Sequence, residues 1–265
     1  MILLDVVFIA LIQGIAEPLP LGASGHLALL GRLAADAEAR TAVVIASEFG
    51  MVLALMLYFW RDQLAMARSV VKLAKGRMDP GGRLLLQILA GSIPALAVSW
   101  AFVTLGGGSA SALVAASAMV VFGLFLWAAD HLGVTVRRVE HLGWLGAVII
   151  GVLQAAAAIP GVSRTGITIT AARLMGFERR DAARFSLLLG IPTIAGHAGY
   201  MLWQLSQKAQ VVVTADLMVA TGLACASAWA TTALFMAWVN RHTYAPFAVW
   251  RILLGAGVLG WAFLF

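Results

Sequence analysis

The sequence has few charged residues and almost no cysteine. Asp, Glu, Lys and Arg make up 11% of the 265 residues, whereas 62% are hydrophobic and the mean hydropathy is +0.95. This balance excludes an ordinary soluble domain and indicates a polytopic membrane protein. The single cysteine, Cys225, excludes an internal disulfide and any metal site built from several cysteines. The apolar runs are continuous rather than alternating in polarity, which favours helices over barrel strands.

Six apolar segments are long enough to cross a membrane as helices. They lie at about 41–60, 84–105, 110–129, 184–204, 212–238 and 247–265. Two further apolar runs, 1–35 and 142–176, are each broken midway by Pro, Gly and polar residues. An interrupted helix at membrane depth is tolerated only where it is buried in protein or lines a watery cavity. We therefore expect two re-entrant helical hairpins with functional tips.

Basic residues indicate which segments face the cytoplasm. If 61–83 is inside, then 130–141, 177–184 and 239–246 are also inside, and these four contain twelve Lys or Arg against three in the outer segments. This is a clear positive-inside bias. The net charge of +6 is then explained by topology and attraction to anionic membrane lipids, so no nucleic-acid partner is needed. The first hairpin would open from outside and the second from inside.

The two halves of the chain resemble each other at a constant offset. Ser24-Gly25 in the first hairpin parallels Thr165-Gly166 in the second, each after a proline, and the two glycines are 141 residues apart. Repeats of opposite orientation place their site at the midplane, where the broken helices meet. We predict an all-α polytopic fold, with one integral membrane domain over 1–265 built from inverted repeats at about 1–129 and 142–265.

The second hairpin tip combines an arginine, hydroxyls and glycines in the sequence Ile159-Pro160-Gly161-Val162-Ser163-Arg164-Thr165-Gly166-Ile167-Thr168. An arginine at mid-membrane costs about 2.5–3.5 kcal/mol on insertion scales and needs an anionic partner. The glycines let the backbone approach a ligand, the hydroxyls are short donors, and a helix beginning near Ile167 would direct its amides at an anion. The predicted phosphate ligands are Gly161, Ser163, Arg164, Thr165, Gly166 and Thr168. The alternative is that Arg164 pairs with a structural carboxylate.

The first hairpin tip offers groups that complement an anion site. Gln13 and Glu17 are four residues apart and share one helical face. A carboxylate near His26 could hold a divalent cation, act as a general base, or neutralise Arg164 when no ligand is bound. Mg²⁺ or Ca²⁺ would need further oxygens from water and substrate phosphate. The predicted cation ligands are Gln13, Glu17 and Glu48.

Three further polar residues have two interpretations each. Glu48 could join the cation, or could be the resting counter-ion of Arg164 or Arg173. Arg251 could cap a structural element or reach a diphosphate. A lone membrane histidine is usually a hydrogen-bonded structural group, which we expect of His197. We expect a functional role for His26, because it lies at a helix break beside Ser24 and Glu17.

These motifs resemble the undecaprenyl pyrophosphate phosphatase family of the bacitracin-resistance type, along most of the chain. The family pattern (E/Q)-x-x-x-E appears at Gln13–Glu17, followed by Leu19-Pro20 and the Ser/Thr-Gly-His turn at Ser24–His26. The signature P-G-x-S-R-[S/T]-G-x-T is intact from Pro160 to Thr168. The stretch from Arg241 to Arg251 is also similar to a later family segment.

The resemblance implies a multi-pass enzyme of the bacterial inner membrane, with its site accessible from the periplasm. It would hydrolyse undecaprenyl diphosphate, a C55 isoprenoid lipid, to the monophosphate with a divalent cation, recycling the carrier for cell-wall synthesis. By position, Arg164 would bind the diphosphate with Ser24 and the second-tip hydroxyls, Glu17 and Gln13 would organise cation or water, and His26 would be the acid, base or nucleophile. The sequence leaves a homodimer open.

This chain departs from the family at Ala23, where the first motif usually has serine, and at Glu48, where we expect the family to have glutamine. A methyl group cannot attack phosphorus, so hydrolysis would use another group: His26, Ser24, Ser163 or a water oriented by Glu17. Of these we expect water or His26. The alternative function is a transporter that flips polyprenyl phosphate or another anionic lipid without hydrolysis, because inverted repeats are at least as typical of transporters.

Overall fold

The computed structural model describes residues 3–29, 37–105, 111–208 and 213–264. These residues form eleven α-helices, two short 3-10 helices and no strand, as the sequence predicts. Six of the helices are long and apolar enough to cross a membrane, and each overlaps one predicted span. They are α3 (Ala37–Tyr58), α5 (Pro80–Thr104), α6 (Ala112–Leu132), α9 (Arg179–Lys208), α10 (Ala215–Trp238) and α11 (Ala245–Leu264). The chain is therefore a multi-pass helical membrane protein.

The two broken apolar runs are helical hairpins. The first consists of α1 (Leu3–Ala16) and α2 (Ala23–Leu29), and the second of α7 (Trp144–Gln154), the 3-10 helix η2 (Ala155–Ala158) and α8 (Arg164–Leu174). Pro18, Pro20 and the positive φ of Gly22 fit the first break, since proline cannot donate to a helix and glycine tolerates φ of +84°.

Helix α8 begins three residues earlier than the sequence predicts. Its first residue is Arg164 rather than Ile167, because Ser163 is the N-cap and its hydroxyl accepts a hydrogen bond from the Gly166 amide at 3.1 Å. Arg164 therefore lies in the first helical turn, which fixes its backbone. Every residue from Arg164 to Arg173 is buried, so α8 lies inside the molecule although it carries three threonines and two arginines.

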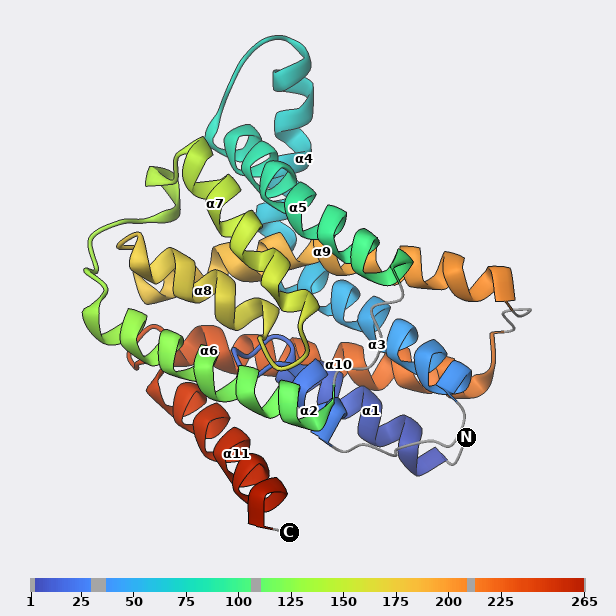
Figure 1. Cartoon of the computed structure of the whole chain (residues 1–265). Helices are drawn as coiled ribbons and strands as arrows, with labels where there is room; N and C mark the ends of the chain where they lie inside the picture. The colour runs from blue at the N-terminus through green and yellow to red at the C-terminus, as the bar shows by residue number, and fades with distance from the viewer. Residues whose placement is uncertain (1–2, 30–36, 106–110, 209–212, 265) are drawn as a thin grey trace.

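The same order of elements occurs twice along the chain: a broken hairpin followed by three long helices. Figure 1 shows α1 beginning at the end of the molecule where α3 and α10 also begin, whereas α7 begins at the opposite end. This order agrees with inverted repeats, although their boundaries at about 1–129 and 142–265 stay a prediction. The additional helices are α4 (Trp60–Ala74), which projects from the inner end, and the 3-10 helix η1 (Val139–His141).

Polar contacts join three of the four predicted inner segments at one end of the molecule. Asp62 pairs with Arg184 at the start of α9. Arg83 donates a hydrogen bond to the Leu142 carbonyl at 3.1 Å, and Arg138 pairs with Glu178 at 3.3 Å. Segments far apart in sequence thus lie together on the side that the basic residues predict to be cytoplasmic.

Asp130 is the buried centre of this inner end. Its side chain is 1% exposed and lies 3.2 Å from Nε of Arg173 and 2.7 Å from Nε of Arg179, and it accepts a hydrogen bond from the Tyr244 amide at 2.8 Å. Arg173 therefore has Asp130 as its counter-ion, and the interpretation of Glu48 as the partner of Arg173 is wrong. One carboxylate ties α6, α8, α9 and the start of α11 together.

We expect Asp130→Asn to destabilise the protein strongly, because it leaves the buried Arg173 without a carboxylate. Breaking a buried ion pair from one side costs about 3–5 kcal/mol. The control is Glu178→Gln, which breaks the exposed pair with Arg138 and should cost at most about 1 kcal/mol. Thermal unfolding in detergent measures both, and equal shifts of Tm for the two variants would contradict the central role of Asp130.

Candidate functional site: two hairpin tips and a shared cavity

The two hairpin tips are in direct contact. A β-carbon added at Gly25 would lie 2.9 Å from Cα of Gly161, so only glycine allows this approach. The hydroxyl of Thr165 donates a hydrogen bond of 2.7 Å to the Glu17 carbonyl, which joins the first break to the beginning of α8. The prediction that the tips meet is therefore confirmed.

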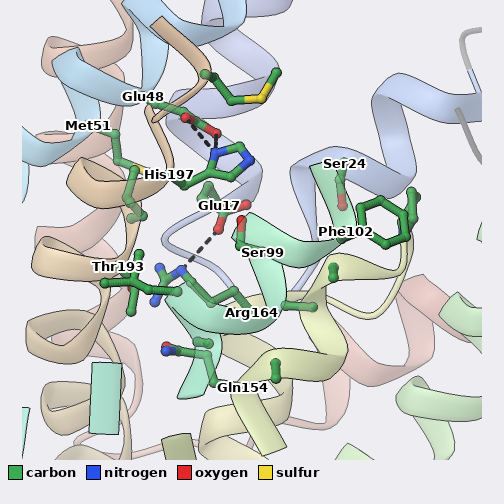
Figure 2. A pocket seen from close by; sticks show the side chains of 18 of the residues that line it. Glu17, Ser24, Glu48, Met51, Ser99, Phe102, Gln154, Arg164, Thr193 and His197 are labelled. Carbon is green, nitrogen blue, oxygen red and sulfur yellow. Dashed lines mark hydrogen bonds and ion pairs between the residues drawn. The ribbon is translucent and has the colours of Figure 1, made fainter. Parts of the chain in front are cut away.

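An ion pair between Arg164 and Glu17 lies at the junction of the tips. Nε of Arg164 donates to Oε1 of Glu17 at 3.2 Å, and the two side chains are 9% and 16% exposed (Figure 2). The two terminal nitrogens donate to the Ser186 carbonyl at 3.2 Å and the Thr165 hydroxyl at 3.1 Å. These bonds use three of the five N–H groups of a guanidinium, so two remain for a ligand.

The ion pair faces a cavity of about 340 Å³ that both hairpins enclose. Helices α3, α5 and α9 complete its wall. The wall combines apolar side chains with a smaller set of polar ones, as is typical of small-molecule sites. The polar residues in the wall are Gln13, Glu17, Ser24, Glu48, Ser99, Gln154, Arg164, Thr193 and His197. Of the residues predicted from sequence, the cavity thus collects Gln13, Glu17, Ser24, Glu48 and Arg164.

Glu48 has a different partner from those considered in the sequence. Both of its carboxylate oxygens lie near Nδ1 of His197, at 3.2 and 3.0 Å (Figure 2). His197 is hydrogen-bonded, as expected, but its partner is a cavity acid, so its position is part of the site. Within the described ranges no three His, Cys, Asp or Glu side chains are grouped closely enough to hold a metal. The carboxylate of Glu48 is thus engaged by His197, and its role as a cation ligand stays a prediction.

His26 does not line the cavity. Its Nδ1 lies 2.8 Å from the Gly22 carbonyl, and its Nε2 accepts a hydrogen bond of 3.0 Å from the indole of Trp250 on α11. A neutral imidazole with its proton on Nδ1 satisfies both contacts. Both ring nitrogens are therefore used within the protein. The role of His26 as acid, base or nucleophile stays a prediction, and it requires the contact with Trp250 to open.

The predicted phosphate ligands around Arg164 mainly build the second tip. Ser163 caps α8, and the Thr168 hydroxyl donates to the Arg164 carbonyl at 2.9 Å and lies 2.6 Å from that of Ser186. Neither residue is part of the cavity wall, and the same is true of the remaining predicted ligands Gly161, Thr165 and Gly166. Ser163 has φ of +65°, a conformation that costs a non-glycine residue free energy and is concentrated at functional sites.

Arg251 holds the second tip from behind. Its side chain is fully buried and donates to the carbonyls of Gly161 and Val162 at 2.9 and 2.7 Å. A β-carbon at Gly166 would lie 2.7 Å from its guanidinium, so that glycine makes room for the arginine. The structure therefore favours the capping interpretation of Arg251 over direct contact with a ligand in the cavity.

Gln154 is a site residue that the sequence reasoning missed. It lines the cavity and is 1% exposed, and neither atom of its amide is hydrogen-bonded in the part of the chain that the structure describes. Buried amides are normally paired, so Gln154 is suited to bind a ligand there. A signal was present: Gln154 follows Gln13 by 141 residues, the same offset that relates Gly25 to Gly166.

Comparisons with known proteins agree with this site. The family model described as "Bacitracin resistance protein BacA" matches residues 6–257. Undecaprenyl-diphosphatase 1 of Paramagnetospirillum magneticum is 49% identical, covering 98% of this chain and 97% of the relative. Undecaprenyl-diphosphatase 1 of Rhodospirillum rubrum is 42% identical (100% and 96%), and undecaprenyl-diphosphatase of Maricaulis maris is 37% identical (98% and 98%). Since the match includes both hairpins and the cavity between them, the chain belongs to the bacitracin resistance protein BacA family.

Proposed function

We propose that this protein hydrolyses undecaprenyl diphosphate to undecaprenyl phosphate and inorganic phosphate in the cavity between the hairpin tips. The relatives that it matches over nearly their full length are named undecaprenyl-diphosphatase. The observation that carries the proposal is the position of Arg164, buried in the wall of the cavity with two N–H groups left for a ligand. A guanidinium matches the geometry of phosphate oxygens and retains its charge at membrane depth.

The cavity suits a phosphate head group attached to a lipid. Arg164 and the amide of Gln154 supply donors, whereas Met51, Phe102 and Ile194 supply apolar wall. A C55 chain is far larger than a cavity of about 340 Å³, so the tail must continue outside it, among the membrane lipids. A membrane protein can provide both environments at one place, because the bilayer itself solvates the tail.

Charge balance supports the predicted divalent cation. The cavity wall carries one guanidinium, Arg164, against the carboxylates of Glu17 and Glu48. A diphosphate adds further negative charge, which the wall alone does not neutralise. Gln13 and Glu17 would hold Mg²⁺ or Ca²⁺, with water and phosphate oxygens as the remaining ligands. The cation would neutralise charge on the phosphate oxygens during the reaction.

Water is the nucleophile that best fits the tip residues. Ala23 presents a methyl group, and within the described parts of the chain the Ser24 hydroxyl has no hydrogen bond to a base. An unassisted serine is a weak nucleophile. Phosphoryl transfer depends mainly on positioning and on stabilising charge, which Arg164 and its anchor Glu17 would provide.

We further propose that the substrate enters from the periplasmic side. The arginine-rich contacts mark the inner end of the molecule, where α5 and α9 begin. Phe102 and Met201 of the cavity wall belong to the opposite parts of these two helices. The cavity is therefore closer to the outer end, which is the side from which the first hairpin enters.

The direct test is phosphate release from undecaprenyl diphosphate by the purified protein in detergent. We expect release that is lost on chelation and restored by Mg²⁺ or Ca²⁺, because the cavity wall does not neutralise the diphosphate alone. Phosphate release that is unchanged by a chelator would contradict the proposal that hydrolysis requires a divalent cation. No release with any cation, together with measurable binding of the lipid, would instead identify a transporter.

We expect Gly190→Ala to lower phosphate release by displacing Arg164. A β-carbon at Gly190 would lie 2.5 Å from one terminal nitrogen of Arg164 and 2.8 Å from its central carbon, and the guanidinium is anchored on Glu17. Loss of one charge-assisted hydrogen bond, about 1.5–3 kcal/mol, corresponds to a fall in kcat/KM on the order of 10- to 100-fold. Gly199→Ala on the same helix is the control, because nothing lies within 4 Å of its β-carbon. Equal activity in both variants would contradict the placement of Arg164.

A further inference from the structure

The Glu48–His197 pair is a second ion pair in the cavity wall, and the proposed roles of Arg164, Glu17 and Gln13 in hydrolysis do not involve it. The pair connects α3 with α9 and lies next to the Glu17–Arg164 pair in the same cavity wall (Figure 2). The His197 side chain is 35% exposed and the Glu48 side chain 14%. An acid and an imidazole in contact with each other and with a phosphate-sized cavity form a familiar arrangement for proton transfer.

The hydrogen bonds of the pair fix which nitrogen of His197 carries the proton. Both oxygens of Glu48 lie within 3.2 Å of Nδ1, and a carboxylate only accepts hydrogen bonds, so Nδ1 must be the donor. In the neutral ring the lone pair is then on Nε2. Among the described residues Nε2 has no hydrogen-bond partner, whereas the ring lines the cavity. Glu48 thus holds His197 in the tautomer that can accept a proton from a cavity water.

The other charged groups facing His197 are each held in an ion pair. They are Glu48 on α3, Glu17 at the first tip and Arg164 on α8; the polar group that α5 contributes to the wall is the uncharged Ser99. Oε1 of Glu17 is bound by the guanidinium of Arg164. His197 contributes to the wall an imidazole whose Nε2 has no hydrogen-bond partner among the described residues.

We propose that His197, oriented by Glu48, is the general base of the hydrolysis, an inference that rests on the proposed function. A water oxygen forms a bond to the terminal phosphorus, and the bond from that phosphorus to the bridging oxygen breaks. The electron pair leaves with the bridging oxygen as the polyprenyl monophosphate. The water proton passes to Nε2 of His197 and then to the released phosphate. Glu48 is a positioning residue, because it acts through the imidazole.

The first test separates kcat from KM. General-base catalysis contributes about 10²–10⁴ in rate, so His197→Gln should lower kcat by roughly 100-fold or more and change KM by less than about threefold. Glu48→Gln should lower kcat comparably, since an amide can donate to Nδ1 and move the ring proton onto Nε2. The double variant should be no slower than the worse single variant, because the two residues act as one unit.

The second test is rescue by free imidazole. His197→Gly leaves space for an added base. Free imidazole should raise the kcat of this variant at least about tenfold, which is less than the 10²–10⁴ that general-base catalysis contributes. Gly190→Ala, which impairs Arg164 instead, should gain nothing from imidazole. A structural bridge between α3 and α9 would behave differently: its loss would lower Tm, and imidazole would not restore turnover.

The outcomes distinguish this inference from the proposed function. An active wild type whose kcat is unchanged by His197→Gln would overturn the base assignment alone. A fall in kcat of the His197 variants that imidazole does not reverse, and that matches the loss of folded protein, would also overturn it. A wild type that releases no phosphate would remove the proposed function and this inference together.

Discussion

The ion pair between Arg164 and Glu17 is the interaction on which the site depends. Each residue is at a break in an apolar hairpin, where an unpaired charge would be very costly, so each requires the other. Their pairing brings together segments 147 positions apart and places the guanidinium of Arg164 in the cavity wall. The contact of Gly25 with Gly161 and the hydrogen bond from Thr165 to the Glu17 carbonyl then follow, because they need the tips at this distance.

The spans and hairpins could be predicted because they depend on local composition. Continuous apolar runs indicate the six long helices, and Pro and Gly interruptions indicate both breaks. The meeting of Glu17 and Arg164 was also predictable, because an unpaired buried charge is costly and an ion pair reduces that cost. The directions in which the other polar side chains point could not be predicted from the sequence. His26 binds Trp250, 224 positions away, and Thr168 contacts Ser186 on another helix, so tertiary neighbours determine where these groups point.

The polar residues of the site divide into two kinds. Those around the tips, such as Ser163 and Thr165, satisfy backbone groups and keep Arg164 in place. Those in the cavity wall, such as Gln154 and His197, have polar atoms without partners among the described residues. The hydroxyls of the second-tip motif thus build the tip without forming the cavity wall. The polar groups of the wall come from α3 and α9 as well as from the hairpins.

The most direct test of the account is a double-mutant cycle on stability, with Glu17→Gln, Arg164→Gln and the double variant compared by thermal unfolding in detergent. If the two side chains are one buried pair, each single variant leaves an uncompensated charge and should lose about 3–5 kcal/mol. The double variant leaves none, so its loss should be smaller than the sum of the two and close to that of one. Additive losses would show that Glu17 and Arg164 are stabilised independently and would contradict the pairing of the hairpin tips.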